Sequence, residues 1–173
     1  MLRVLQLTRI LTARSEIPTV SGVRVRNFSG TADIAAWLAI RRIAFADQLR
    51  GVRDWTTDDF RAEFTDHPAW RPEWFWMAEE QRRDIATPIP VGAISLMWRG
   101  PDHSRPAVHW LAVLPRCRRR GIGELLLATL EAAVWDAGHR QIWLETHGSW
   151  HAAVAFYQAA GYRDARAHAK RGQ

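Results

Sequence analysis

The sequence predicts an α/β fold in one domain, in which a mixed sheet carries helices on both faces. Hydrophobic periodicity is the first observation, because it predicts elements in the order β-α-α-β-β-β-α-β-α-β. Composition is the second: the chain has 173 residues, of which 47% are hydrophobic, enough to bury a core without disulfides. The third is continuity, since no internal repeat and no Pro- or Ser-rich linker divides the chain.

In the first half of the domain, the sequence pattern predicts one strand and two helices. Residues 23–28 alternate between apolar and polar side chains, as a strand with one buried face does. The Ser-Gly-Thr sequence at 29–31 offers a helix start, and apolar residues with helical spacing continue to Phe45. Thr57 and the two aspartates after it begin a second, short helix, which residues 66–68 end with Asp-His-Pro.

The second half predicts a strand-rich segment followed by two helix-strand units. Two apolar runs separated by a charged, proline-containing loop predict an antiparallel hairpin. Gly138 and Gly161 are placed to end the two helices. The predicted elements are strands 74–78, 90–98 and 107–113, helix 123–137, strand 141–146, a helix from 149 or 150 to 160, and a last strand 162–167.

Residues 1–19 are expected to lie outside the domain, which then covers residues 20–170. The segment is basic, has no acidic residue before Glu16, and lacks both a continuous apolar region and a cleavage pattern. We interpret it as an N-terminal extension; a presequence, an extra helix or a start codon placed too early would explain it equally well.

Charge predicts an anionic ligand. The formal net charge is +6, and nearly all of the positive charge comes from arginine, dense only at residues 116–120. No nucleic-acid-binding module is present, so focused binding of a small anion is preferred and no nucleic acid partner is expected. No apolar run could span a bilayer, so no membrane partner and a cytoplasmic location are expected. Cys117 alone makes no disulfide or cysteine zinc site, and no metal cluster is visible.

The strongest local signal lies where the predicted strand 107–113 leads into the following helix. The strand ends near Pro115, an Arg- and Gly-rich turn follows, and the helix begins near Gly123. The first main-chain N–H groups of a helix have no partner within it, and the positive end of its dipole favours an anion there. Gly121 and Gly123 allow close approach of a phosphate, and residues 118–120 add arginine charge at the rim.

This stretch resembles the acyl-CoA pyrophosphate loop of the GNAT superfamily of N-acetyltransferases. The shared pattern is Arg118-x-x-Gly121-x-Gly123, after Leu-Ala-Val-x-Pro and before a Leu-rich helix. A later segment, Ala153-x-x-Phe-Tyr157-x-x-x-Gly161-Tyr, is similar to the family's second motif. The resemblance extends from about residue 107 to 162 and is topological before that. It implies a mostly antiparallel sheet and direct acetyl transfer from acetyl-CoA, the co-substrate, to an amine.

The resemblance also implies which residues bind the cofactor. Pantetheine is expected to bind main-chain groups of a strand that splays from its neighbour. Trp150 stands where the family usually has Asn, so it is expected to stack beside the cofactor while Ser149 caps the helix. The expected cofactor-binding residues are Leu111, Ala112, Val113, Arg118, Arg119, Arg120, Gly121, Ile122, Gly123, Glu124 and Trp150.

Two side chains are implied to act in catalysis. Tyr157 matches the family's general acid, which protonates the departing thiolate; the alternative is a core tyrosine. His109 stands where many relatives have a glutamate that acts as the base, and imidazole suits that task near neutral pH. Strand alternation predicts that His109 and Leu111 share one face, with Val108 and Trp110 on the other. Glu145, His147 or no base at all are the alternatives.

The acceptor is expected to be an amine-bearing small molecule or peptide. The Trp-rich stretch 70–76 is either core or an aromatic wall for that amine, with Glu73, Glu79 or Asp54 attracting the ammonium group. Residues 55–60 together with this stretch show a limited resemblance to acetyltransferases of the mycothiol-synthase type, which does not identify a substrate. A catalytically silent acyl-CoA-binding sensor and a basic nucleic-acid-binding protein are the alternative functions, and the protein is expected to be a monomer or a homodimer.

Overall fold

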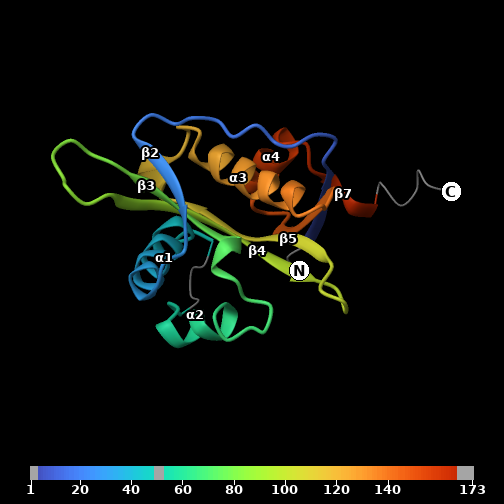
Figure 1. The fold of residues 1–173 in the computed structure, drawn as a ribbon, viewed down its shortest axis with the longest axis horizontal. Coiled ribbons are helices and arrows are strands. Elements are labelled where there is room, and N and C mark those ends of the chain that lie inside the picture. The colour runs from blue at the N-terminus through green and yellow to red at the C-terminus, as the bar shows by residue number, and fades with distance from the viewer. Residues whose placement is uncertain (1–3, 49–52, 167–173) are drawn as a thin grey trace.

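A seven-stranded sheet in the order β2-β3-β4-β5-β6-β1-β7 forms the centre of the computed structural model, which describes residues 4–48 and 53–166. Helices α1 and α2 lie on one face of the sheet and α3 and α4 on the other (Figure 1). The strands are β1 Val4–Ile10, β2 Val23–Asn27, β3 Phe75–Glu80, β4 Ile89–Arg99, β5 Arg105–Val113, β6 Gln141–His147 and β7 Arg163–Asp164. The helices are α1 Thr31–Ala44, α2 Thr57–Glu63, α3 Ile122–Asp136 and α4 His151–Ala159.

The α/β fold with helices on both faces is confirmed, and so is the mixed, mostly antiparallel sheet. All neighbouring strands pair antiparallel except β5 and β6, which are parallel. Aromatic side chains fill the α1–α2 side, where Trp37 contacts Phe60, Phe64 and Phe75. The leucines of α3 that have helical spacing are buried on the other side.

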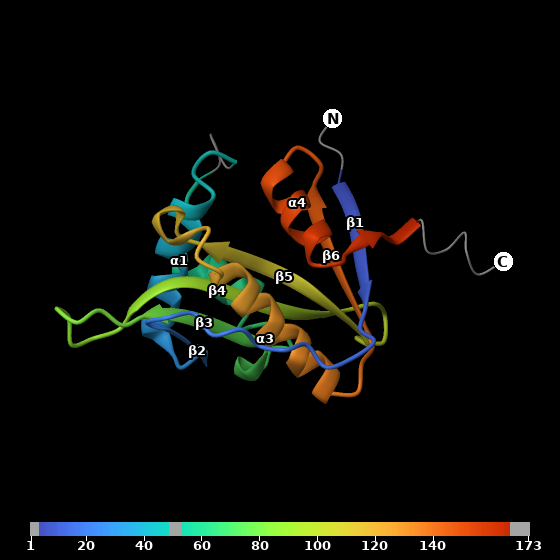
Figure 2. The ribbon, with the colours of Figure 1, turned by 90° about the horizontal axis from the view of Figure 1, so that it is seen from above.

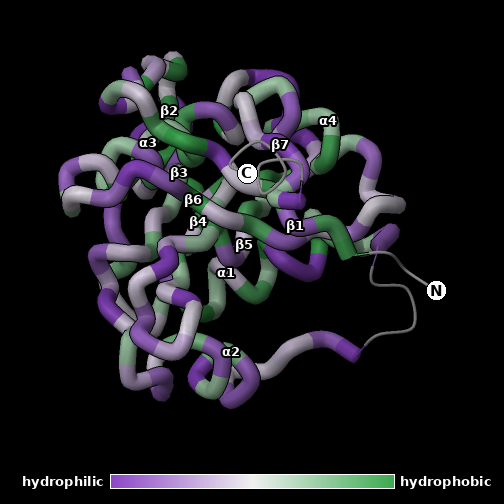
Figure 3. Tube along the Cα trace, turned by 90° about the vertical axis from the view of Figure 1, so that its right-hand side faces the viewer, coloured by the Kyte–Doolittle hydropathy of each residue, from purple (hydrophilic) through white to green (hydrophobic). Residues whose placement is uncertain are grey.

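Most predicted elements are present, with ends shifted by a few residues. The predicted last strand is the main difference, because β7 contains only Arg163 and Asp164, paired with two residues of β1. Ala167, the predicted end of that strand, lies outside the described residues. Hydrophobic and hydrophilic residues are mixed along the helices (Figure 3). Within the described part of the chain, no helix is long and apolar enough to cross a membrane.

The expected N-terminal extension contributes a strand to the sheet. β1 pairs antiparallel with all seven residues of β6 and lies between β6 and β7. An extra helix was one expectation for this segment, and it is wrong. After β1 the chain continues along α3 before it enters β2 (Figure 2). Hydrophobic spacing alone did not show the strand, because β1 acquires its partner only from β6, more than 130 residues later in the sequence.

A buried carboxylate fixes this N-terminal segment to α3. Glu131 is 2% exposed and accepts two hydrogen bonds from Arg9, at 2.8 and 2.7 Å. Ser15 and the phenol of Tyr162 also donate to it. Burial and the Glu131 charge raise the pKa of Tyr162, so this phenol stays a neutral donor.

We expect Arg9→Ala to destabilise the protein by about 3 kcal/mol, because it leaves a buried carboxylate without its counter-ion. The measurement is the midpoint of urea unfolding. Arg14→Ala is the matched control, since Arg14 joins the same segment to Asp136 of α3, but both side chains are half exposed. That change should leave the midpoint nearly unchanged. Equal midpoints for the two variants would show that the Arg9–Glu131 pair does not stabilise the fold.

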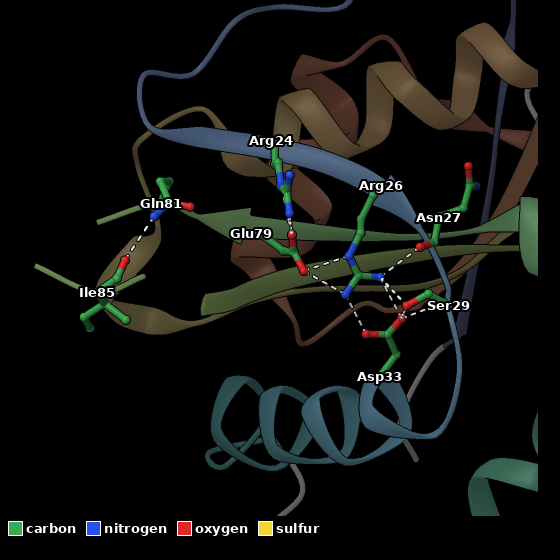
Figure 4. Close-up of polar contacts among 8 residues, drawn as sticks. All are labelled: Arg24, Arg26, Asn27, Ser29, Asp33, Glu79, Gln81 and Ile85. Atoms are coloured by element: carbon green, nitrogen blue, oxygen red, sulfur yellow. Dashed lines mark hydrogen bonds and ion pairs between the residues drawn. The ribbon is translucent and has the colours of Figure 1, made fainter. Parts of the chain in front are cut away.

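A second polar cluster joins β2, β3 and α1 at the opposite end of the sheet (Figure 4). Arg26 of β2 donates to both oxygens of Asp33 at 2.7 Å and to Glu79 of β3 at 2.7 Å. Arg24 also pairs with Glu79, which is buried. The predicted use of Glu79 to attract an acceptor ammonium therefore finds no support, because two arginines already neutralise its charge.

Candidate active site

Strands β5 and β6 separate part-way along their length. They pair only at Ala107 with Trp143 and at Val108 with Leu144, although β5 continues to Val113 and β6 to His147. Beyond these two pairs, the main-chain groups of β5 that face β6 have no strand partner. This is the separation that the family resemblance predicts, and it opens one edge of β5 to a ligand.

A cavity of about 510 Å³, here called the groove, lies at this separation. Residues from β1, β4, β5, β6 and α4, together with Phe45 after α1, line it. The groove brings together four predicted site residues, namely His109, Leu111, Trp150 and Tyr157. The two alternative bases, Glu145 and His147, line it as well.

The loop before α3 presents a row of free main-chain N–H groups. Arg119 and Gly121 have left-handed backbone angles, with φ of 60° and 82°, and α3 begins at Ile122. Leu125 is the first residue of the helix whose N–H makes a backbone bond, to the Gly121 carbonyl. The six N–H groups of residues 119–124 have no acceptor within the described residues. With the dipole of a 15-residue helix behind them, these groups fit a diphosphate.

The three loop arginines are not equivalent. Arg118 donates to the carbonyls of Val113 and Ala44, at 3.1 and 2.7 Å, and so braces the loop against β5 and α1. Arg120 pairs with Glu80 at 2.6 Å and lowers the pKa of that carboxyl. Arg119 makes no polar contact with any other described residue. Of the three arginines expected to add charge at the rim of the loop, only Arg119 is free of such contacts, while Arg118 and Arg120 hold the loop in place.

Gly123 is needed for helix packing. A Cβ built on it would lie 3.3 Å from the Phe156 ring of α4, closer than ordinary van der Waals contact. The N-terminal part of α3 therefore packs directly against α4. The neighbouring residue on α4 is Tyr157, the predicted acid.

Tyr157 is 8% exposed and lines the groove from α4. Burial raises the pKa of its phenol, so the hydroxyl stays protonated throughout the neutral range. The ring contacts Phe156 and Tyr162, whereas the hydroxyl has no hydrogen-bond partner among the described residues. The Tyr157 hydroxyl is thus a neutral hydrogen-bond donor in the groove, and such a donor can stabilise negative charge that develops on a ligand.

His109 lies at an irregularity in β5. Ser95 pairs with Trp110 and Leu96 with Val108, so His109 is an extra residue without a partner on β4. The predicted alternation is therefore wrong: His109 contacts Phe64 while Trp110 contacts Trp37, and both side chains point toward α1 and α2. A β-bulge redirects a side chain in this way.

Glu63, at the end of α2, is the residue that sequence reasoning missed. Its carboxylate bonds to His109 Nε2, and this contact lowers the pKa of Glu63. The other ring nitrogen, Nδ1, lies 3.0 Å from Arg99 Nη2. Because a guanidinium group can only donate, Nδ1 is the acceptor in the contact with Arg99, and Nε2 is the donor to Glu63. No sequence signal links Glu63 to His109, which lies 46 residues further along the chain.

Trp150 closes the groove next to α4. It occupies the N-cap position, but no side chain caps the helix, so the expected cap by Ser149 is not formed. The indole packs against His147 in a tilted arrangement, with ring centroids 4.8 Å apart, and its centroid lies 5.8 Å from that of the Phe45 ring. His147 Nδ1 is buried and has no hydrogen-bond partner among the described residues.

The Trp-rich stretch lies outside the groove. Trp70 packs against Phe28, Phe64 and Phe75, in the core of the α1–α2 side. Trp74 and Trp76 contact each other, and neither lines the groove. These tryptophans therefore pack in or against the hydrophobic core, with Trp76 buried and Trp70 and Trp74 partly buried, and they do not form a wall of the groove. The tryptophans that do line the groove are Trp110, Trp143 and Trp150.

Comparison with known proteins agrees with this geometry. The profile of the acetyltransferase (GNAT) family matches residues 40–162. The mycothiol acetyltransferase of Salinispora arenicola is 33% identical over 171 residues, which cover 94% of this chain and 52% of that protein. The chain thus spans about half the length of the curated relatives it matches.

Two solved structures share the fold. The GCN5-related N-acetyltransferase from Sphaerobacter thermophilus has a TM-score of 0.74 at 20% identity, covering 93% of this chain and 48% of that one. The NatC complex bound to Gag peptide and CoA has a chain with a TM-score of 0.60 at 20% identity, covering 80% of this chain and 82% of that one. With the family profile matching most of its length, the chain belongs to the acetyltransferase (GNAT) family.

Proposed function

We propose that the protein is an N-acetyltransferase that moves an acetyl group from acetyl-CoA directly to the primary amine of a small molecule or peptide. The row of free N–H groups at residues 119–124, beside a strand whose edge is open, is the observation that carries this proposal. The first feature suits a diphosphate and the second suits the amide groups of pantetheine. Both belong to one ligand, CoA.

In this proposal the main chain holds most of the cofactor. The N–H groups of residues 119–124 bind the pyrophosphate, with Arg119 adding charge and Arg118 and Arg120 bracing the loop. The unpaired edge of residues 111–113 binds the pantetheine arm and polarises the acetyl carbonyl through a main-chain N–H. Trp150 lines the same groove and stacks beside the arm.

When bound, acetyl-CoA supplies the thioester. The acceptor nitrogen forms a bond to the carbonyl carbon, the carbon–sulfur bond breaks, and the amine loses one proton. Tyr157 donates its hydroxyl proton to the departing sulfur. His109 accepts the amine proton at Nδ1, in a ring oriented by Glu63. Arg99, which is exposed, must move away from Nδ1 for this step.

Binding and turnover of acetyl-CoA test the proposal together. A ligand at a hundred times its Kd stabilises the folded state by about 2.7 kcal/mol, which raises the Tm of a chain this long by roughly 5–10 °C. We expect that shift with acetyl-CoA and release of free thiol when amines are added. A shift without thiol release from any amine would favour the silent acyl-CoA sensor. Salt-sensitive DNA binding without a shift would favour the nucleic-acid-binding protein.

Glu63→Gln tests whether Glu63 positions His109. We expect kcat to fall about tenfold while KM for acetyl-CoA is unchanged, because the amide holds the imidazole less firmly and in a less defined tautomer. In a His109→Gln background the same change should cost nothing further. A purely structural role would instead lower kcat by the same factor in both backgrounds. Steady-state kinetics of the two single variants and the double variant decide between these outcomes.

The acceptor is proposed as a small amine by analogy with the relatives. The curated relatives are called mycothiol acetyltransferases, a name that describes those longer proteins. In this chain the groove also contains Glu145, an exposed carboxylate that can attract an ammonium group. A panel of amines assayed by thiol release identifies the acceptor.

A further inference from the structure

Two arginines face each other across the β4–β5 hairpin at one end of the groove. Arg99 and Arg105 are direct partners in the antiparallel register, and both line the groove. Like charges at directly opposite positions destabilise a strand pair. The hairpin itself does not need this arrangement, since a neutral residue at either position would pair without repulsion.

Neither arginine forms an ion pair with a carboxylate among the described residues. Arg99 Nη2 lies 3.0 Å from His109 Nδ1, and Glu63 bonds to the opposite side of that ring, close enough for the Arg99 charge to help lower the pKa of Glu63. Arg105 lies over the Trp143 ring, with its Cζ 5.5 Å from the centroid. Asp102 lies close enough for the Arg105 charge to help lower its pKa, but its Oδ1 accepts a hydrogen bond from the Ser104 hydroxyl and none from Arg105. Both guanidinium groups therefore keep donors for a ligand.

The groove itself supplies little negative charge to balance them. Glu145 is its only acidic lining residue in the described chain, and its Oε1 accepts a hydrogen bond from Gln6 at 2.9 Å. Trp143 and Glu145 both lie on β6, two residues apart and so on the same face. The groove thus has a cationic end at the hairpin and an anionic group next to it, an arrangement that suits a ligand carrying both charges.

We propose that Arg99 and Arg105 bind an anionic group, a carboxylate or a phosphate, on the amine acceptor. The inference rests on the proposed function, which places the acceptor in this groove. Guanidinium groups bind both kinds of anion through charge-assisted hydrogen bonds. The pair then determines specificity: it favours amines that carry a negative charge over neutral amines of the same shape.

Two matched probe pairs test the proposal and distinguish the two anions. Triglycine is compared with triglycinamide, and O-phosphoethanolamine with ethanolamine, by titration calorimetry on CoA-saturated protein. We expect the anionic member of at least one pair to bind about tenfold more tightly, as a charge-assisted bond implies. Arg99→Gln and Arg105→Gln should each remove most of that difference. Arg82→Gln, in the β3–β4 loop where Arg82 pairs with Asp84, is the control and should keep it.

The pair that shows the preference identifies the anion. Equal affinities within both pairs, or no binding of any probe at millimolar concentration, would overturn the inference. Thiol release from acetyl-CoA is measured on the same four amines. If thiol is released but the anionic amines show no preference over the neutral ones, the proposed function is supported and the anion site is contradicted. A preference that depends on Arg105, without release from these four amines or from any amine of the wider panel, supports the anion site and contradicts the proposed function.

Discussion

Gly121→Glu is expected to abolish binding of acetyl-CoA. Gly121 has a φ of 82°, and its N–H belongs to the row of free groups at residues 119–124. A glutamate there, with its Cβ next to Val20, adds a carboxylate beside the row of free N–H groups and so repels the diphosphate. We expect the Tm shift with acetyl-CoA to disappear and the Kd to rise by at least about a hundredfold, as the loss of two or more charge-assisted hydrogen bonds implies.

Backbone strain has to be separated from loss of the site. A side chain in the left-handed region costs about 1–2 kcal/mol of stability wherever it occurs. Gly138, at the other end of α3, has a φ of 90°, and a Cβ added there would have no neighbouring atom within 4 Å. Gly138→Glu therefore adds the same residue with comparable strain, and it should keep the affinity for acetyl-CoA. If Gly121→Glu also retained that affinity, the loop would not be the diphosphate site.

The row of free N–H groups before α3 could be predicted from sequence because its cause is local. A strand end, a left-handed glycine and a helix start follow one another within a few residues, and their spacing alone leaves the N–H groups of residues 119–124 free. The side chains around it were less predictable. Arg118 and Arg120 find acceptors on α1, β5 and β3, which only the folded chain brings near the loop.

The surroundings of His109 could not be predicted for a related reason. Which face a strand residue occupies follows from alternation only while the register is regular, and the extra residue in β5 breaks that regularity. The bulge turns His109 toward α2, where Glu63 meets it. Both the orientation and the partner depend on pairing between segments far apart in the sequence, so neither follows from the motif that suggested His109.

The N-terminal strand β1 could not be predicted as an element from its own residues. Val4–Ile10 is short, and its apolar residues fit both helical and strand spacing. Its partners, β6 and β7, lie at the other end of the chain. β1 also forms part of the groove, which Val4 and Gln6 line beside Glu145 and His147. A domain starting at residue 20 would therefore lose one wall of the candidate site.

Tyr157→Phe is expected to lower kcat about a hundredfold, the lower range for loss of a general acid, while KM for acetyl-CoA changes little. Burial raises the pKa of the phenol, which weakens it as an acid. Desolvation acts in the same direction on a thiolate that leaves into this groove, since it raises the proton affinity of the sulfur. The variant keeps the ring and its contacts with Phe156 and Tyr162, and loses only a hydroxyl that has no partner among the described residues.

Tyr162→Phe is the matched control, because its hydroxyl has a structural partner instead. That phenol is buried and donates to Glu131 at 3.1 Å. Removing it should cost about 2 kcal/mol of stability, in the usual range for a hydrogen bond to a charged group, and leave kcat unchanged. Tyr157→Phe should do the reverse, with reduced turnover and an unchanged urea midpoint. Unreduced turnover in Tyr157→Phe would leave this tyrosine as a packing residue beside the thioester, and the departing thiolate would then need another donor.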